Sequence, residues 1–216
     1  MFITLEERNR LFKQNEKHFS NLLEIIKNSG ELLEGNCVYL HNSHIESDEL
    51  IPKQRNLMTL AKHSSSVLEI GFNAGHSALL MLMTNPNLTI KSIDICSHAY
   101  TKPCYKYLSS VFPGRIILIE GNSKEALKTL REPPYDVYHI DGCHSKEVAN
   151  SDFLLCRKHS KNSSIVVWDD VNFRELGELW ESYKDQNYVE EIRFLETHLY
   201  PHICGLFLRY PFGQSD

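Results

Sequence analysis

The chain has 216 residues, of which 42% are hydrophobic, and its formal net charge is -5 at pH 7. This length fits one α/β domain with a small N-terminal cap, and the apolar fraction is ample for a sizeable core. The negative net charge gives no sign of the basic surface that a nucleic-acid-binding protein needs, and no apolar run approaches the ~20 residues of a membrane span.

The six cysteines are scattered, with no CxxC pair among them, and the first residues lack the apolar stretch of a signal peptide. This argues against a structural zinc site and against a disulfide framework. We therefore expect a cytoplasmic protein in a reducing compartment.

The N-terminal part is predicted to be helical. Apolar residues recur near helical spacing over 4–28, and Asn28, Ser29 and Gly30 end this helix. The segment 31–46 is irregular and is expected to lie over the sheet edge. A second helix is expected from about residue 47 to 63. We therefore divide the chain into an N-terminal helical cap and loop (1–46) and a catalytic domain (47–216).

From residue 66 onward, short β-rich runs alternate with helical segments. Strands are predicted over 67–71, 89–95, 115–122, 135–141 and 163–170, each followed by a helix, and two more over 189–199 and 204–212. The gap of 200–203 is too short for a parallel crossover, so the last two strands should form an antiparallel hairpin. The predicted fold is Rossmann-like: a seven-stranded, mostly parallel sheet with a C-terminal antiparallel hairpin and helices on both faces.

A glycine turn follows the first predicted strand, with the pattern Glu69-x-Gly71-x-x-x-Gly75. Gly71 permits a tight turn and close approach of a ligand to the backbone, and Gly75 permits close packing of helix on strand. A dinucleotide fingerprint would place glycine at Asn73, so the sequence favours a cofactor without a pyrophosphate. Ordinary strand–helix packing is the alternative explanation of the two glycines.

Polar residues also end the next two strands. Asp94 is placed to accept hydrogen bonds from ribose hydroxyls. Asn122 and Ser123 are placed to meet an adenine edge, although Ser123 could equally be the N-cap of the following helix.

Three aspartates follow two further strands that are expected to be neighbours: Asp141 after one, Asp169 and Asp170 after the other. Because parallel strands end together, three carboxylates should surround one small volume. Mg²⁺ or another divalent cation prefers such oxygen ligands. Each aspartate could instead cap a helix or begin a turn.

With these motifs, the chain resembles the class I S-adenosylmethionine-dependent methyltransferases over about residues 50–210. The resemblance implies that the glycine turn holds the methionine part of the cofactor, that Asp94 holds the ribose, and that Asn122 and Ser123 frame the adenine. It thus assigns cofactor binding to Glu69, Gly71, Asn73, Gly75, Ser77, Asp94, Asn122, Ser123 and Asp141.

The aspartates further resemble those of the metal-dependent O-methyltransferases, which include catechol, caffeoyl-CoA and sugar types and a branch with an IDGxH signature. His144 stands where the catechol type has its general-base lysine, which implies a role as base; it could instead cap the next helix or ligate the metal. The implied catalytic residues are His144 and Asp141, and the implied metal ligands are Asp141, Asp169 and Asp170.

The string EPPYD at 132–136 resembles a motif of amino-group methyltransferases, but its prolines precede the strand rather than end it. Oxygen is therefore the expected acceptor atom. We expect O-methylation of a small hydroxylated substrate, sugar-like or catechol-like, by a protein without nucleic-acid or membrane partners that could form a homodimer. The alternatives are a metal-independent methyltransferase on another acceptor and a non-catalytic cofactor-binding scaffold protein; a dinucleotide-dependent oxidoreductase is disfavoured by Asn73.

Overall fold

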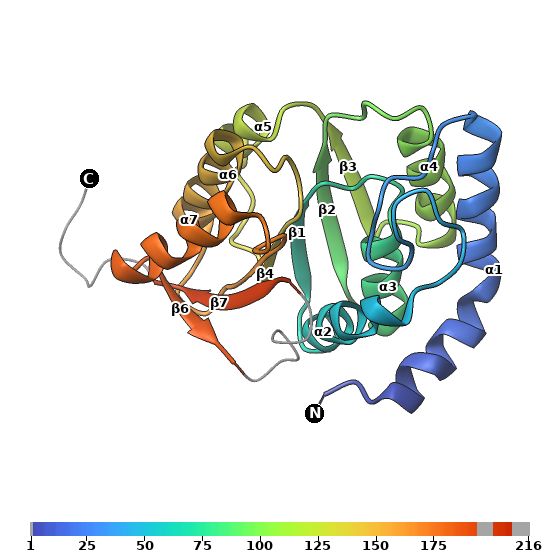
Figure 1. Ribbon diagram of the computed structural model, residues 1–216, viewed down its shortest axis with the longest axis horizontal. Coiled ribbons are helices and arrows are strands. Elements are labelled where there is room, and N and C mark those ends of the chain that lie inside the picture. The colour runs from blue at the N-terminus through green and yellow to red at the C-terminus, as the bar shows by residue number, and fades with distance from the viewer. Residues whose placement is uncertain (1, 194–200, 209–216) are drawn as a thin grey trace.

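The computed structural model describes residues 2–193 and 201–208, and Figure 1 shows their arrangement. The helices are α1 (Leu5–Ser29), α2 (Ile51–Lys62, after a 3₁₀ turn at Asp48–Leu50), α3 (His76–Thr84), α4 (Thr101–Val111), α5 (Ser123–Thr129), α6 (Lys146–His159) and α7 (Arg174–Asp185). The strands are β1 (Ser66–Ile70), β2 (Thr89–Asp94), β3 (Ile116–Glu120), β4 (Val137–Ile140), β5 (Ile165–Trp168), β6 (Val189–Ile192) and β7 (Ile203–Phe207).

The described strands form one seven-stranded sheet in the order β3-β2-β1-β4-β5-β7-β6. β1 to β5 pair in parallel, whereas β7 runs antiparallel to both β5 and β6. Helical crossovers join the parallel strands, and the short β6–β7 connection imposes the antiparallel pairing. The predicted fold is confirmed. Parts of the two predicted hairpin strands (194–199 and 209–212) lie outside the described residues.

Two layers of helices cover the sheet, one on each face (Figure 1). Along β1, Val67 belongs to the core beneath α1 to α4, whereas its neighbour Leu68 belongs to the core beneath α5 to α7. Successive strand residues point to opposite faces, so the apolar runs serve both cores.

The N-terminal helix α1 packs across the first layer. Thr4 accepts a hydrogen bond from the backbone N–H of Glu7 at its start, and Gly30 ends it in the left-handed conformation. Phe12 and Leu22 are buried in the core shared with α2 to α4. The predicted boundary at residue 46 stays a prediction. None of the described helices combines the length and the apolar character needed to cross a bilayer.

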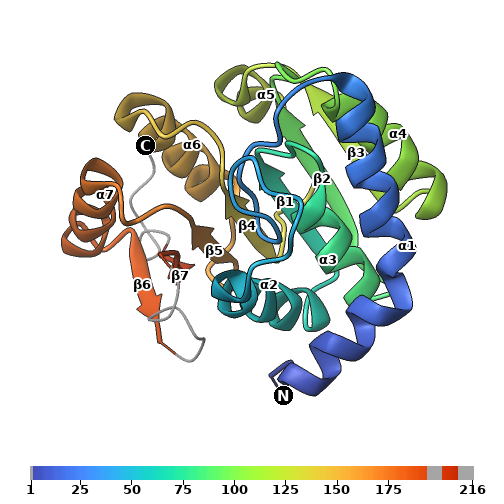
Figure 2. The ribbon, with the colours of Figure 1, turned by 45° about the vertical axis from the view of Figure 1, so that its right-hand side comes forward.

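β1, β4 and β5 are neighbours in the middle of the sheet, so the segments that leave their carboxyl ends lie together. The segment between α1 and α2 reaches the same edge, as Figure 2 allows the reader to follow. There Glu34 Oε2 accepts a hydrogen bond from Asn73 Nδ2 at 3.1 Å, and Glu31 Oε1 accepts one from the backbone N–H of Ala99 at 2.9 Å.

Candidate active site

The glycine turn between β1 and α3 has the backbone that its sequence predicts. Gly71, Asn73 and Gly75 all have positive φ angles, of 92°, 52° and 78°. A Cβ atom on Gly71 would collide with the backbone oxygen of Asp141, and one on Gly75 would collide with the rings and methyls of Phe72 and Leu108. Glycine is therefore required at both positions, and the turns after β1 and β4 touch through their main chains.

The Asp94 carboxylate binds the backbone of this turn. Its Oδ2 accepts hydrogen bonds from the backbone N–H groups of Phe72 and Asn73, each at 2.8 Å, and its Oδ1 accepts one from Cys96 at 2.6 Å. A carboxylate has about four acceptor sites, so one remains for a ligand hydroxyl. The arrangement fits a ribose, and the role of Asp94 toward it stays a prediction.

Glu69 lies inside the sheet and is fully buried. Its two oxygens accept hydrogen bonds from Ser77 Oγ at 2.5 Å and from Ser92 Oγ at 2.6 Å. The hydrogen bond between the predicted residues Glu69 and Ser77 thus joins β1 to α3 on either side of the glycine turn. Direct contact of either with a methionine moiety stays a prediction.

Asn122 and Ser123 follow β3, which pairs in parallel with β2, so they lie at the same edge of the sheet as Asp94. Asn122, not Ser123, is the N-cap of α5: its Oδ1 accepts a hydrogen bond from the backbone N–H of Lys124 at 2.9 Å. The alternative of Ser123 as the cap is therefore wrong, because the helix begins one residue earlier. The Ser123 side chain instead hydrogen-bonds the buried Asp152. Their role toward adenine stays a prediction.

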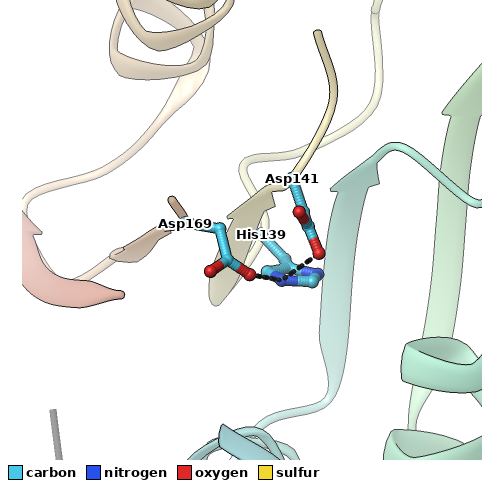
Figure 3. A group of neighbouring side chains, drawn as sticks. All are labelled: His139, Asp141 and Asp169. Carbon is cyan, nitrogen blue, oxygen red and sulfur yellow. Dashed lines mark ion pairs between the residues drawn. The ribbon is translucent and has the colours of Figure 1, made fainter. Parts of the chain in front are cut away.

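The three predicted aspartates do gather at the ends of β4 and β5, but they divide into two groups. We call Lys53, His139, Asp169 and the facing oxygen of Asp141 the inner cluster. Lys53 Nζ is 3.0 Å from Asp141 Oδ2 and also pairs with Asp169 Oδ2. His139 Nε2 is 3.7 Å from each of these oxygens, as Figure 3 shows for the histidine and its two aspartates. Two cations thus face two carboxylates.

The inner cluster is almost closed to solvent, because the side chains of Lys53, His139 and Asp169 are at most 4% exposed. Burial favours a neutral His139, but its interactions with the carboxylates of Asp169, Glu69 and Asp141 prevail and raise its pKa to about 9. Burial also opposes ionisation of Asp169, yet Lys53 and His139 hold its pKa well below the usual range. These directions favour a charged imidazolium at His139 and a charged carboxylate at Asp169.

Asp141 links the inner cluster to the solvent side. Its side chain is 24% exposed, whereas that of Asp169 is 1% exposed. Burial and the charge of Asp169 raise the pKa of Asp141, and Lys53 and His139 act in the opposite direction. Asp141 is consequently the carboxylate of this cluster that a ligand in the cleft can reach.

We call His144 and Asp170 the outer cluster. His144 Nε2 lies 2.7 Å from Asp170 Oδ2, and the side chains are 47% and 21% exposed. Asp170 has a φ of 58°, in the left-handed region, and its backbone N–H donates a hydrogen bond to Asp169 Oδ1 at 3.0 Å. The hydrogen bond to Asp170 raises the pKa of His144, because it favours the charged imidazolium.

An open cleft with an empty volume of about 220 Å³ runs beside both clusters. Its lining includes Asp141, Cys143, His144, Asp169, Asp170 and Leu176. The ring of Phe173 lies 4.9 Å from that of His144, at the edge of this lining. Both polar and apolar side chains therefore line this cleft.

The two clusters differ as sites for a divalent cation. At the inner position, an ion between Asp141 and Asp169 would lie beside the Lys53 ammonium, and like charges repel, so these residues do not fit a metal. Asp141, His144 and Asp170 also bring three ligand atoms within 4.8 Å of one another, and there the oxygen and imidazole donors suit a divalent ion. The predicted metal set of Asp141, Asp169 and Asp170 stays a prediction.

Sequence reasoning missed Lys53 and His139. Lys53 shares a helical face with Leu57 and Leu60 of α2, all three buried, so a lysine on an apolar stripe is the signal that could have found it. His139 precedes Asp141 by two positions, which puts both on one side of the β4 line. The contacts of Glu31 and Glu34 with the glycine turn region have no comparable signal, because they depend on an irregular segment.

Comparisons with known proteins agree with this geometry. The sequence model of a family described as "Methyltransferase domain" matches residues 68–171. No curated protein matches the chain significantly.

Several solved O-methyltransferase and methyltransferase structures share the fold. An O-methyltransferase from Bacillus cereus, in complex with SAH, is 14% identical, with a TM-score of 0.65 over 89% of this chain and 91% of that one. The O-methyltransferase TomG from Streptomyces achromogenes, involved in tomaymycin synthesis and in complex with SAM, is 17% identical, with a TM-score of 0.63 over 88% and 89%. The SAH-bound methyltransferase PaMTH1 from Podospora anserina is 13% identical, with a TM-score of 0.59 over 87% and 88%.

Proposed function

We propose that the chain is a class I, S-adenosylmethionine-dependent methyltransferase that methylates a hydroxyl oxygen of a small molecule, a proposal supported by the family match over residues 68–171 and by the shared fold. The observation that supports the proposal is the outer cluster, in which an imidazole lies 2.7 Å from a carboxylate and both side chains line the cleft. The glycine turn, which would hold the methyl donor, touches Asp141 on the same wall.

His144 is the base in this proposal. When its Nε2–H donates to Asp170 at 2.7 Å, the lone pair of the ring lies on Nδ1. Nδ1 takes the proton of the acceptor hydroxyl, and the oxygen attacks the sulfonium methyl in line, which leaves S-adenosylhomocysteine as the product. Alignment of the two reactants supplies much of the rate, because the leaving thioether needs no proton.

Asp141 positions the acceptor. It is fixed from behind by Lys53 at 3.0 Å and exposes its remaining acceptor sites to the cleft, where a second hydroxyl of a diol can donate. A divalent ion held by Asp141 and Asp170 would lower the pKa of the acceptor hydroxyl and fix its oxygen. The acceptor class in this proposal is a sugar-like or catechol-like diol.

The test is methyl transfer from S-adenosylmethionine to a panel of catechols, sugars and enols, with amines for comparison, followed as release of S-adenosylhomocysteine. We expect turnover with at least one diol, and a loss of about 10²- to 10⁴-fold in kcat for His144→Ala. Addition of EDTA and readdition of Mg²⁺ separate the metal-assisted reaction from the metal-independent one.

Two results would count against the proposal. If the donor binds but only amines are methylated, the acceptor atom is wrong. If calorimetry shows donor binding and no panel member reacts, a cofactor-binding scaffold is the better description.

A further inference from the structure

Lys53 lies where the two innermost carboxylates of the site converge. Its ammonium is 3.0 Å from Asp141 Oδ2 and pairs with Asp169 Oδ2, while His139 faces both oxygens from the other side at 3.7 Å. The Lys53 side chain is 4% exposed, so its charge is compensated by protein groups rather than by water. A buried ammonium in this setting binds its carboxylates persistently.

The helix that carries Lys53 is anchored on both sides of it. Pro52 occupies the first turn of α2, where proline is tolerated. The next residue, Gln54, accepts hydrogen bonds from the buried Arg8 and donates one to the backbone oxygen of Cys37 at 2.8 Å. Lys53 lies outside residues 68–171, the part of the chain that matches the methyltransferase family model.

The occupied position is the one at which a divalent ion would bridge Asp141 and Asp169. A second cation there would face the Lys53 ammonium in a water-poor space, where charge repulsion is poorly screened. The position is thus filled by a side chain of the protein itself.

We propose that Lys53 is the resident cation of the acceptor site: it holds Asp141 on the cleft wall and excludes divalent ions from the position between Asp141 and Asp169. The inference rests on the proposed function and deepens it, because it assigns the positive charge behind the acceptor to a lysine. Lys53 contacts the carboxylates and does not line the cleft, so it is a positioning residue.

The experiment removes the charge and asks whether a metal takes its place. Lys53→Met keeps an unbranched apolar chain of similar length and deletes only the ammonium. Mn²⁺ binding is measured by calorimetry and by the Mn²⁺ electron paramagnetic resonance signal, for wild type, Lys53→Met and Lys53→Met/Asp169→Asn. Lys62→Met is the matched control, since Lys62 ends the same helix and pairs with Glu7 at 2.9 Å, in an ion pair with no member in either cluster.

We expect the Kd of Lys53→Met for Mn²⁺ to be at least about tenfold lower than that of wild type, since the two carboxylates are then uncompensated. The gain should vanish in Lys53→Met/Asp169→Asn, because the outer group of Asp141, His144 and Asp170 does not use Asp169. Lys62→Met should bind Mn²⁺ as wild type does. Equal affinities of wild type and Lys53→Met, or a gain that persists in the double variant, would overturn the proposal.

The double variant Lys53→Met/Asp169→Asn controls for misfolding of Lys53→Met, because it removes one negative charge together with the positive one and so restores the charge balance. If Lys53→Met folds only when Mn²⁺ is present, the ion has replaced the ammonium and the proposal is supported. If the double variant folds and Mn²⁺ does not restore Lys53→Met, the proposal is wrong.

Activity supplies an independent readout once an acceptor is found. Turnover of Lys53→Met should fall and should be restored by Mn²⁺, a rescue that a merely structural lysine would not give. Failure to find any acceptor would count against the proposed function, whereas the Mn²⁺ affinities would still decide the role of Lys53.

Discussion

The inner and outer clusters use the same residue types and differ in what surrounds them. Asp169 and Asp170 are adjacent in the chain, yet one is 1% exposed and pairs with a buried lysine, and the other is 21% exposed and pairs with His144 on the cleft wall. His139 and His144 differ in the same way. Charges compensated inside the protein are held in place, whereas those at the cleft remain available to a ligand, which is why we propose a positioning role for the inner cluster and a reacting role for the outer one.

Asp169→Asn should give the largest loss of stability, because it breaks a buried ion pair and leaves Lys53 and His139 with one carboxylate fewer. We expect the free energy of unfolding to fall by about 3–5 kcal/mol, measured by urea denaturation. A loss below about 1 kcal/mol would show that the inner cluster is no more compensated than a surface pair.

Asp94→Ala tests a carboxylate that is held by backbone N–H groups rather than by cations. Removal of charge-assisted hydrogen bonds costs about 1.5–3 kcal/mol each, so we expect a roughly ten- to hundredfold weaker affinity for S-adenosylmethionine by calorimetry. Asp136→Asn is the control, since Asp136 lies before β4 and pairs with Lys161. An unchanged affinity of Asp94→Ala for S-adenosylmethionine would show that Asp94 does not bind the ribose.

His76 sharpens the comparison, because it is as buried as His139 but neither of its ring nitrogens has a hydrogen-bond partner among residues 2–193 and 201–208. Burial lowers its pKa from 6.5 to about 3. Between these values the unfolded chain binds the proton and the folded chain does not, so stability is full above about pH 6.5 and is lost as pH falls.

The measurement is the free energy of unfolding at pH 6.5 and pH 5. The His76 contribution to the loss should be about 2 kcal/mol, and His76→Leu should remove it. The exposed His44 provides the control substitution, His44→Asn, which should keep the wild-type slope. If the free energy of unfolding of His76→Leu falls with pH as that of wild type does, His76 is not the source of the loss.

Asp170→Asn should have the smallest effect on stability, at most about 1 kcal/mol, because its pair with His144 is open to solvent. Its effect is on titration instead. Asp170 raises the pKa of His144, so this pair stabilises the fold at low pH and the contribution is lost as pH rises through that pKa.

Without Asp170, the His144 pKa should fall, as followed by the NMR shift of its ring protons, and the acid limb of the pH–rate profile should move to lower pH. An unchanged His144 titration in Asp170→Asn would show that Asp170 does not raise the pKa of His144.

Much of the fold was predictable from local patterns. Strand and helix alternation, the short connection before β7 and the glycine turn each act over a few residues, and each has a direct backbone reason. Parallel neighbours end together, which is why Asp141 and the pair Asp169–Asp170 could be expected at one edge.

The division of the aspartates was not predictable in the same way. It depends on Lys53, which is 88 positions from Asp141 in the chain, and on the left-handed backbone of Asp170. Neither the packing of α2 against the strand ends nor a positive φ at a non-glycine residue follows from composition or periodicity. A prediction from the strands alone therefore treats three carboxylates as equivalent.

The main-chain contact at Gly71 has a mechanical consequence. Because no side chain separates the turn after β1 from the backbone of Asp141, the loop that would cradle the donor and the loop that faces the acceptor cannot move independently. Any displacement of one is transmitted to the other as a push on the main chain. In the proposed reaction, the spacing between donor and acceptor would therefore depend on the main chain of these two turns.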